Sequence, residues 1–445
     1  MKNLLFCVLA LCGLHWATLA EARVDIQHWI TASGAKVYFV ASPSLPMLDV
    51  QMDFAAGSAF ETDPGKAGLA ELTNALTQSG VQGLDEEQIA NRLADLGARL
   101  HGSADYDRAS LSLRTLSTPA ERAAALDLLH AMIATPTFPE AILQREQGRS
   151  IAAIQEADTK PDSLVGKRFA ETIYPGHPYG VQATAASVAR LTRDDLLRFW
   201  RQHYGARRAS ISIVGAVTRA EAEAIAARLG DGLPDAPAAA PLPAVTLPLA
   251  QTVTVAHPAA QTHIYLGLPA IKRSDADYFP LLVGNYVLGG GGFVSRLMQE
   301  VREKRGYAYS VYSYFSPRQL EGPFQIGLQT KRTQAADALK VVHATLDDFL
   351  RQGPSAAELK AAKQNLIDGQ ALRLDSNAKI LGSVAMIGFY DLPLDYLEQF
   401  AQHVAAVSAA QVRAAFARHV KTENLVTVIV AGDSDLAPAA AAAAQ

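Results

Sequence analysis

One segment of this chain occurs twice. The first copy, LTRDDLLRFWRQHYGARRASISIVG, spans residues 191–215, and the second, VSAAQVRAAFARHVKTENLVTVIVAG, spans residues 407–432. Thr192 of the first copy and Ser408 of the second are 216 residues apart (408 minus 192) in a chain of 445 residues. Because solenoid repeats are only about 20–50 residues long, a repeat of this length predicts a duplicated domain.

Both copies predict the same pair of elements. Asp195 and Gln411 follow the hydroxyl residue by three positions, which is typical of a capped helix start, and each copy ends in a β-branched run typical of a strand. The strands expected at 37–40 and 50–54 are neighbours in sequence and predict a hairpin. Strand clusters with helices between them favour an α+β fold with two tandem homologous domains, each a mainly antiparallel sheet with helices on one face.

The composition changes between the two copies. Residues 233–248 contain five prolines, many alanines and no hydrophobic periodicity, which indicates an extended linker. We therefore expect an N-terminal domain at 23–232 and a C-terminal domain at 249–435. Residues 436–445 are alanine-rich and predict a disordered tail.

The first 22 residues predict a secretory signal peptide. Lys2 precedes an apolar stretch at 4–14, and small residues then form a cleavage pattern between Ala20 and Ala22. The apolar stretch is too short to cross a bilayer, and no later stretch approaches the roughly 20 apolar residues that a spanning helix needs. We therefore expect an exported, periplasmic protein without a membrane span.

The composition excludes several classes of protein. The 40 basic and 44 acidic residues give a net charge of -4, which provides no basis for nucleic-acid binding. A mean hydropathy of +0.07 excludes a mostly disordered chain. Because Cys7 and Cys12 both lie in the signal peptide, the mature chain would have no disulfide, no catalytic thiol and no cysteine-ligated metal.

Common catalytic motifs are absent from the sequence. The glycines at 289–292 precede no Gly-Lys-Ser/Thr, so they indicate a flexible loop beside a pocket and no phosphate site, and no Gly-x-Ser-x-Gly occurs. None of the eleven histidines has a partner at the i,i+3 or i,i+4 spacing that places two rings around one metal ion. We expect packing or capping roles for the histidines at repeat-equivalent positions, namely His130, His203, His343 and His419.

Three further stretches carry a resemblance to a known family. Residues 54–76 resemble the strand and first helix of the pitrilysin/insulinase (inverzincin) metallopeptidases, and residues 174–180 resemble the proline-rich turn of that family. Residues 288–311 are similar to its C-terminal signature. The resemblance runs from about Val24 to Asp433 and implies two domains that form a clam-shaped chamber.

One departure from the family concerns zinc. Active members carry H-x-x-E-H on the first helix, with two histidine ligands and a glutamate as general base. The matching positions here are Glu71, Asn74 and Ala75, so both imidazoles and the base are missing. The family's third ligand would fall in residues 151–156, where Glu156 fits only with a shifted register. We therefore expect no metal cofactor in this chain.

The second half keeps the other part of the family's active site. The resemblance implies that an arginine, and a tyrosine seven residues later, reach the active site, and this spacing stands here as Arg302 and Tyr309. A guanidinium and a phenol can hold the substrate backbone and stabilise a developing oxyanion. The alternative is an ion-paired, solvated helix, because residues 302–305 form a mixed charge run.

The resemblance implies a function in a pair of chains. We expect a non-zinc subunit that forms a heterodimer with a zinc-bearing homologue, degrades peptides or unfolded polypeptides, and supplies Arg302 and Tyr309 in trans. Substrate would add as a strand to a sheet edge in the first domain. The glycine run would line the chamber through Gly289, Gly290, Gly291 and Gly292.

Two other functions compete with this expectation. The first is a non-catalytic peptide-binding or scaffold protein of the same fold, which would have no need of Arg302 and Tyr309. The second is an enzyme with an unconventional metal site made of Glu71 and distant histidines. Unchanged activity after chelation and in Glu71→Ala would eliminate this last reading.

Overall fold

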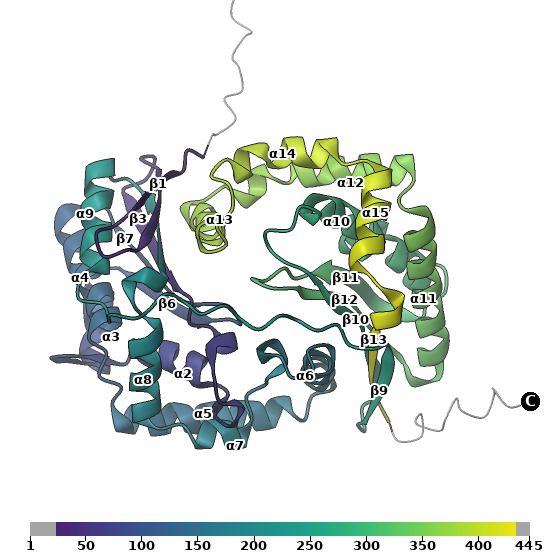
Figure 1. The fold of residues 1–445 in the computed structure, drawn as a ribbon, viewed down its shortest axis with the longest axis horizontal. Helices are drawn as coiled ribbons and strands as arrows, with labels where there is room; N and C mark the ends of the chain where they lie inside the picture. The colour runs from purple at the N-terminus through teal and green to yellow at the C-terminus, as the bar shows by residue number, and fades with distance from the viewer. Residues whose placement is uncertain (1–23, 433–445) are drawn as a thin grey trace, which may run out of the picture.

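The computed structural model describes residues 24–432, which form two mixed halves that lie side by side (Figure 1). The predicted signal peptide and the tail at 436–445 lie outside the described residues. The first half contains the elements from β1 to α9, and the second half contains those from β9 to β13. Within the described chain, no helix is long and apolar enough to cross a membrane.

A six-stranded sheet forms the centre of the first half. The buried strand β8 (Ala209–Gly215), which ends the first copy of the repeat, lies between two strands that the sequence predicted to pair with each other. The predicted hairpin is therefore wrong, because β8 pairs parallel with β2 and antiparallel with β3. The full order is β1 (Gln27–Ile30), β2 (Lys36–Ala41), β8, β3 (Met47–Phe54), β7 (Ala109–Leu116) and β6 (Arg99–Ala104).

The second half repeats this plan with five strands. Strand β13 (Val426–Ala431), the equivalent of β8, again pairs parallel with one neighbour and antiparallel with the other. The capping boxes predicted at Thr192 and Ser408 are both present, at the starts of α8 (Arg193–His203) and α15 (Ala409–His419). The order of the sheet is β11 (Ala308–Phe315), β12 (Gly322–Lys331), β10 (Gln261–Ile271), β13 and β9 (Gln251–Ala256).

Each sheet packs one face against helices of its own half. In the first half, apolar side chains of the central strands meet those of the helices in one buried cluster. The second half has an equivalent cluster. The main helices of the first half are α2 (Leu69–Leu76), α3 (Glu86–Asp95), α4 (Pro119–Ala134), α5 (Glu140–Ala157), α7 (Ala185–Ala189), α8 and α9 (Arg219–Gly230), and those of the second half are α10 (Tyr278–Asn285), α11 (Ala335–Gln352), α12 (Ala356–Asp368), α14 (Tyr396–Ala406) and α15.

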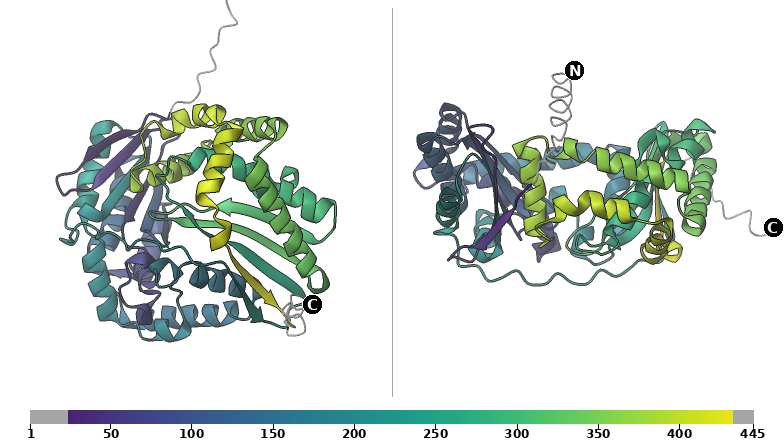
Figure 2. Two further views of the ribbon diagram at one scale, coloured as in Figure 1. Left: turned by 45° about the vertical axis from the view of Figure 1, so that its right-hand side comes forward. Right: turned by 90° about the horizontal axis from the view of Figure 1, so that it is seen from above.

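The opposite face of each sheet receives a helix from the other half. Helix α13 (Asn377–Phe389) of the second half packs on the first sheet, and α6 (Pro161–Ile173) of the first half packs on the second sheet (Figures 1 and 2). Leu381 and Val384 of α13 contact the cluster around Val214. The equivalent cluster on the second sheet joins Phe169 to Val428. Because water is excluded from both clusters, this exchange stabilises the two halves as one body.

A buried carboxylate also joins the halves. Asp107 is 1% exposed and accepts hydrogen bonds from the Tyr179 hydroxyl, from the Tyr390 hydroxyl at 2.8 Å and from the backbone N–H of Gln319 at 2.8 Å. Tyr390 and Gln319 belong to the second half. Burial raises the pKa of both phenols, so both stay protonated and donate.

The predicted linker follows one side of the molecule. Residues 233–250 form no helix or strand and run from the first half to the second (Figure 2). Two side chains of the first half fix its course: Arg207 pairs with Asp235 at 2.5 Å, and His177 Nε2 lies 2.9 Å from the carbonyl oxygen of Pro243.

Candidate functional site

Arg302 and Tyr309, the two residues that the family spacing singled out, lie together in the second half. Arg302 lies on a π-helical segment, Met298–Glu303, and Tyr309 lies on the edge strand β11. The register between β11 and β12 shifts at Tyr309, which makes Tyr309 the extra residue of a β-bulge. Bulges redirect side chains next to functional sites, and here the tyrosine is 82% exposed with its ring centroid 5.1 Å from Arg302 Cζ.

Arg302 forms one long ion pair, in which its Nε lies 3.6 Å from Glu303 Oε1. It donates no hydrogen bond within the described part of the chain. The predicted surface ion pairs are closer at the next two basic residues, because Lys304 and Arg305 pair with Glu300 at 2.6 and 2.8 Å. The ion-paired reading therefore fits those two residues well, whereas Arg302 keeps its N–H groups free of hydrogen bonds.

The two side chains border a surface hollow of about 620 Å³ that the glycine run also lines. Gly289, Gly290 and Gly292 line the hollow, whereas a Cβ on Gly291 would lie 2.7 Å from the carbonyl oxygen of Tyr286. The run belongs to helical turns, Tyr286–Gly290 and Gly292–Val294, where the sequence predicted a loop. A Cβ on Gly289 would lie 2.4 Å from Ser313 Oγ, so glycine here permits β11 to approach.

The degenerate zinc-motif positions lie on α2 in the first half. Glu71 and Ala75 are exposed, and Glu71 forms no hydrogen bond or ion pair with any other described residue. Asn74 is 2% exposed, and its Nδ2 donates to the Ser110 carbonyl at 3.2 Å and to the Tyr204 hydroxyl at 3.5 Å. The position of the family's general base is therefore occupied by an amide that ties α2 to the sheet.

The start of α2 is capped by the side chain of Glu61, which lies before the helix in the sequence. Glu61 accepts hydrogen bonds from the backbone N–H of Gly68 at 3.3 Å and of Ala70 at 2.7 Å. Burial nevertheless raises the pKa of the Glu61 carboxyl to about 7. Helix α2 thus begins at a carboxyl group that titrates near neutral pH.

The residues of this chain do not fit a zinc ion at α2. Glu156, the alternative third ligand, is exposed and pairs with Lys160 at 2.7 Å. Within residues 24–432, one group of three potential ligands converges, namely Asp275, Asp277 and His419. Both oxygens of Asp277 already accept hydrogen bonds from Arg418, at 2.6 and 2.8 Å, so this group is an ion-pair cluster.

Three of the four repeat-equivalent histidines have contacts of the predicted kind. His419 Nδ1 lies 2.7 Å from the Ala270 carbonyl, and His130 Nε2 lies 2.8 Å from the Asp231 carbonyl. The His203 ring lies 4.3 Å from the Phe199 ring, and burial lowers its pKa to about 4. These histidines are therefore engaged in the fold.

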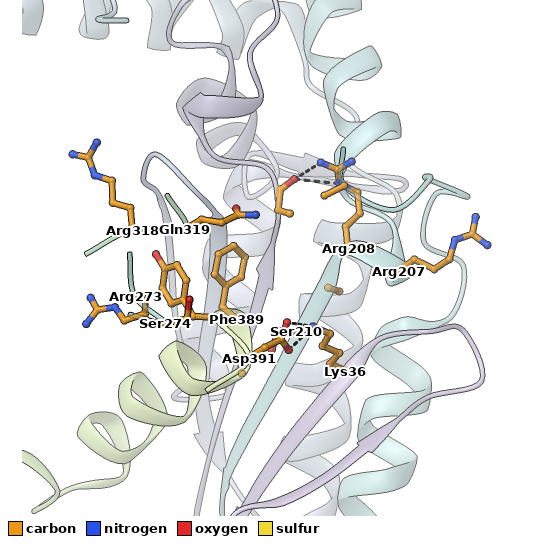
Figure 3. A pocket seen from close by; sticks show the side chains of 15 residues that line it. Lys36, Arg207, Arg208, Ser210, Arg273, Ser274, Arg318, Gln319, Phe389 and Asp391 are labelled. Carbon is orange, nitrogen blue, oxygen red and sulfur yellow. Dashed lines mark hydrogen bonds and ion pairs between the residues drawn. The ribbon is translucent and has the colours of Figure 1, made fainter. Parts of the chain in front are cut away.

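A cavity of about 270 Å³, lined in part by basic residues, lies where the two halves meet the linker (Figure 3). Five cationic side chains line it, but their charged ends do not converge. Lys36 pairs with Asp391 at 2.5 Å, and Arg208 donates to the Ala55 carbonyl at 2.6 Å. The other three guanidinium groups point away from the cavity in Figure 3, and they belong to Arg207, Arg273 and Arg318. The cavity therefore does not concentrate positive charge.

The edge strand nearest to α2 is β6. Among residues 24–432, no strand pairs with one side of β6, and a Cβ on Gly102 would lie 2.9 Å from Asn74 Oδ1, which shows how closely α2 approaches it. Its alternate side chains, Arg99, His101 and Ser103, are exposed. A free edge of this kind can pair with an extended peptide.

The comparisons with known proteins identify the family. A model of the insulinase peptidase family M16 matches residues 36–186, and a model of the M16 inactive domain matches residues 190–366. A solved M16 inactive domain from Pseudomonas fluorescens is 39% identical, with a TM-score of 0.89, and the match covers 92% of this chain and 98% of that chain. This chain belongs to the M16 peptidase family.

Other M16 relatives are named both as peptidases and as non-peptidases. An uncharacterized zinc protease of Streptomyces coelicolor is 28% identical over 74% of this chain and 72% of its own length. A non-peptidase homologue of Helicobacter pylori is 23% identical over 96% of this chain and 98% of its own. The predicted family and two-domain α+β fold are confirmed, and the inactive-type relatives agree with an M16 chain that lacks its own zinc site.

Sequence reasoning missed one residue of this M16 site. Phe293 is 63% exposed, and its ring centroid lies 4.9 Å from Arg302 Cζ, on the guanidinium that Tyr309 also contacts. An aromatic residue directly after four glycines, within the matched signature, was the available signal. The bulge at Tyr309 had no comparable signal, because it depends on pairing with β12.

Proposed function

We propose that this M16 chain is the exported, non-zinc subunit of a heteromeric zinc metallopeptidase that degrades peptides or unfolded polypeptides. One observation carries the proposal: Arg302 and Tyr309 meet at an open hollow with the guanidinium free of hydrogen bonds, while Asn74 takes the place of the catalytic base. A chain that only filled space would gain nothing from a half-buried guanidinium that donates no hydrogen bond beside an exposed tyrosine.

The two groups have distinct roles in this proposal. The Arg302 guanidinium offers parallel N–H donors that can hold a substrate carbonyl or carboxylate. The Tyr309 hydroxyl donates to the oxygen on which negative charge develops during attack on the peptide bond. The zinc ion and the activated water belong to the partner, since the positions matching the zinc motif in this chain cannot supply them.

The substrate would be held as an extended strand. Strand β6 presents a free backbone edge beside α2, and backbone hydrogen bonds give affinity with little sequence preference. Export rests on residues 1–22, and a periplasmic location agrees with this leader. The periplasmic Escherichia coli protease PqqL shares the fold with a TM-score of 0.79 at 19% identity, and the match covers 92% of this chain and 46% of PqqL.

Hydrolysis of an unstructured fluorogenic peptide tests the proposal. We expect no activity from the mature chain alone and chelator-sensitive activity when it is mixed with the zinc-bearing homologue of the same organism. Arg302→Ala should remove most of that activity. Arg305→Ala is the matched control, because Arg305 lies in the same charge run but is paired with Glu300.

A peptide-binding or scaffold role is the second candidate, favoured by the non-peptidase name of the Helicobacter pylori relative. It predicts no activity in the mixture, with peptide binding that Arg302→Ala leaves unchanged. Fluorescence anisotropy of a labelled peptide separates the two functions. Activity from the lone chain would overturn both.

A further inference from the structure

Phe293 is held on the surface by a fixed backbone. Its loop is tied by two hydrogen bonds, from Ser295 Oγ to the Gly292 carbonyl and from Gln299 Nε2 to the Phe293 carbonyl, both at 2.7 Å. Gly292 adopts φ +61°, a conformation that favours glycine. A phenylalanine side chain left 63% exposed gains little from the hydrophobic effect, so its position needs another reason.

Two aromatic rings contact the Arg302 guanidinium. The guanidinium carbon lies 4.9 Å from the Phe293 centroid and 5.1 Å from the Tyr309 centroid. By contrast, two nearby arginines donate hydrogen bonds to carboxylates: Arg296, which also lies over the Phe349 ring, donates to Glu358, and Arg305 donates to Glu300. Aromatic faces attract a cation without neutralising it and without occupying its N–H groups, whereas a carboxylate does both.

We propose that Phe293 is a positioning residue for Arg302, an inference that rests on the proposed function. The ring fixes the guanidinium plane at the mouth of the hollow so that its N–H edge stays available to substrate. It also keeps the ion pair with Glu303 long, with 3.6 Å between Nε and the carboxylate, so that no hydrogen bond forms there. Without the ring, the guanidinium would close on this carboxylate and lose its free edge.

Steady-state kinetics of the assembled two-chain enzyme test this role. We expect Phe293→Ala to lower kcat/KM by about 3- to 10-fold, as removal of a cation–π contact predicts. Phe293→Trp should restore activity, because tryptophan offers the best face for a cation. Glu303→Gln in the Phe293→Ala background should recover part of the loss, because the competing carboxylate is gone.

A double-mutant comparison separates positioning from direct contact. In the Arg302→Ala background, Phe293→Ala should have no further effect. An additive loss would mean that Phe293 acts on substrate by itself and would overturn the proposal. Val294→Ala is the matched control, since Val294 is adjacent and 69% exposed but has no aromatic face to offer Arg302.

The outcomes also distinguish a failure of this inference from a failure of the proposed function on which it rests. If Arg302→Ala keeps full activity, the proposed function fails. If Arg302→Ala is inactive and Phe293→Ala matches the unmodified enzyme, only the inference fails. Should Phe293→Ala assemble poorly, a Phe293→Leu variant as active as Phe293→Trp would overturn the inference, because leucine fills space but offers no aromatic face.

Discussion

Arg302 and Arg305 show how two identical side chains in one turn acquire different chemistry. Arg305 donates to Glu300, whereas Arg302 contacts two aromatic rings. We expect Arg302→Lys to lower the activity of the assembled enzyme at least 10-fold, because lysine lacks the planar fork that stacks and binds bidentately. Arg305→Lys should preserve activity in the same assay, and equal losses in both variants would argue for a general effect of charge.

Asn74 is a buried amide at the position that the resemblance matches to the family's general base. Its amide serves the Ser110 carbonyl and the Tyr204 hydroxyl in a buried site. We expect Asn74→Ala to lower the free energy of unfolding by about 1–3 kcal/mol, because buried partners lose their hydrogen bonds. Urea unfolding measures this change. Ala75→Ser, at the exposed neighbouring position, should be neutral, and a neutral Asn74→Ala would show that the amide is dispensable.

At the scale of elements, α2 couples its stability to pH through Glu61. The pKa of this carboxyl is raised to about 7 in the folded state, above its ordinary value, so the folded protein binds the proton more tightly than the unfolded chain. The stability from protonated Glu61 is present below its ordinary pKa and is lost as pH rises through about 7. We expect Glu61→Gln, which keeps a capping oxygen, to gain stability relative to the unmodified chain between pH 5 and pH 8. Urea unfolding at several pH values checks this, and a pH-independent difference would contradict it.

Local elements were predictable from the sequence, and long-range pairings were not. The helix–strand unit of the repeat was predicted because its caps, Thr192 and Ser408, and its β-branched strands act within a few residues. The position of β8 between β2 and β3 could not be read, because that pairing joins residues far apart in sequence. For the site, the spacing of Arg302 and Tyr309 was readable, but the ring of Phe293 became relevant only once the chain was folded.

At the scale of the whole molecule, the exchange of α6 and α13 makes the linker dispensable as a covalent tether. We expect a chain with a protease site inserted near Ala239 to remain one particle after cleavage, because each sheet still holds the other half's helix. Size-exclusion chromatography in buffer and in mild urea checks this. Separation into two fragments in buffer would show that the interface is weaker than its buried clusters indicate.

The same exchange dictates an order of events during synthesis. The first sheet is complete at Gly215, but the face around Tyr38 and Val214 is covered only by Leu381 and its neighbours near the end of the chain. A first half that folded before this helix was in place would therefore expose an apolar face to water. A gene truncated after the linker would therefore encode an aggregation-prone fragment and not a working half, because the first half depends on a helix of the second half.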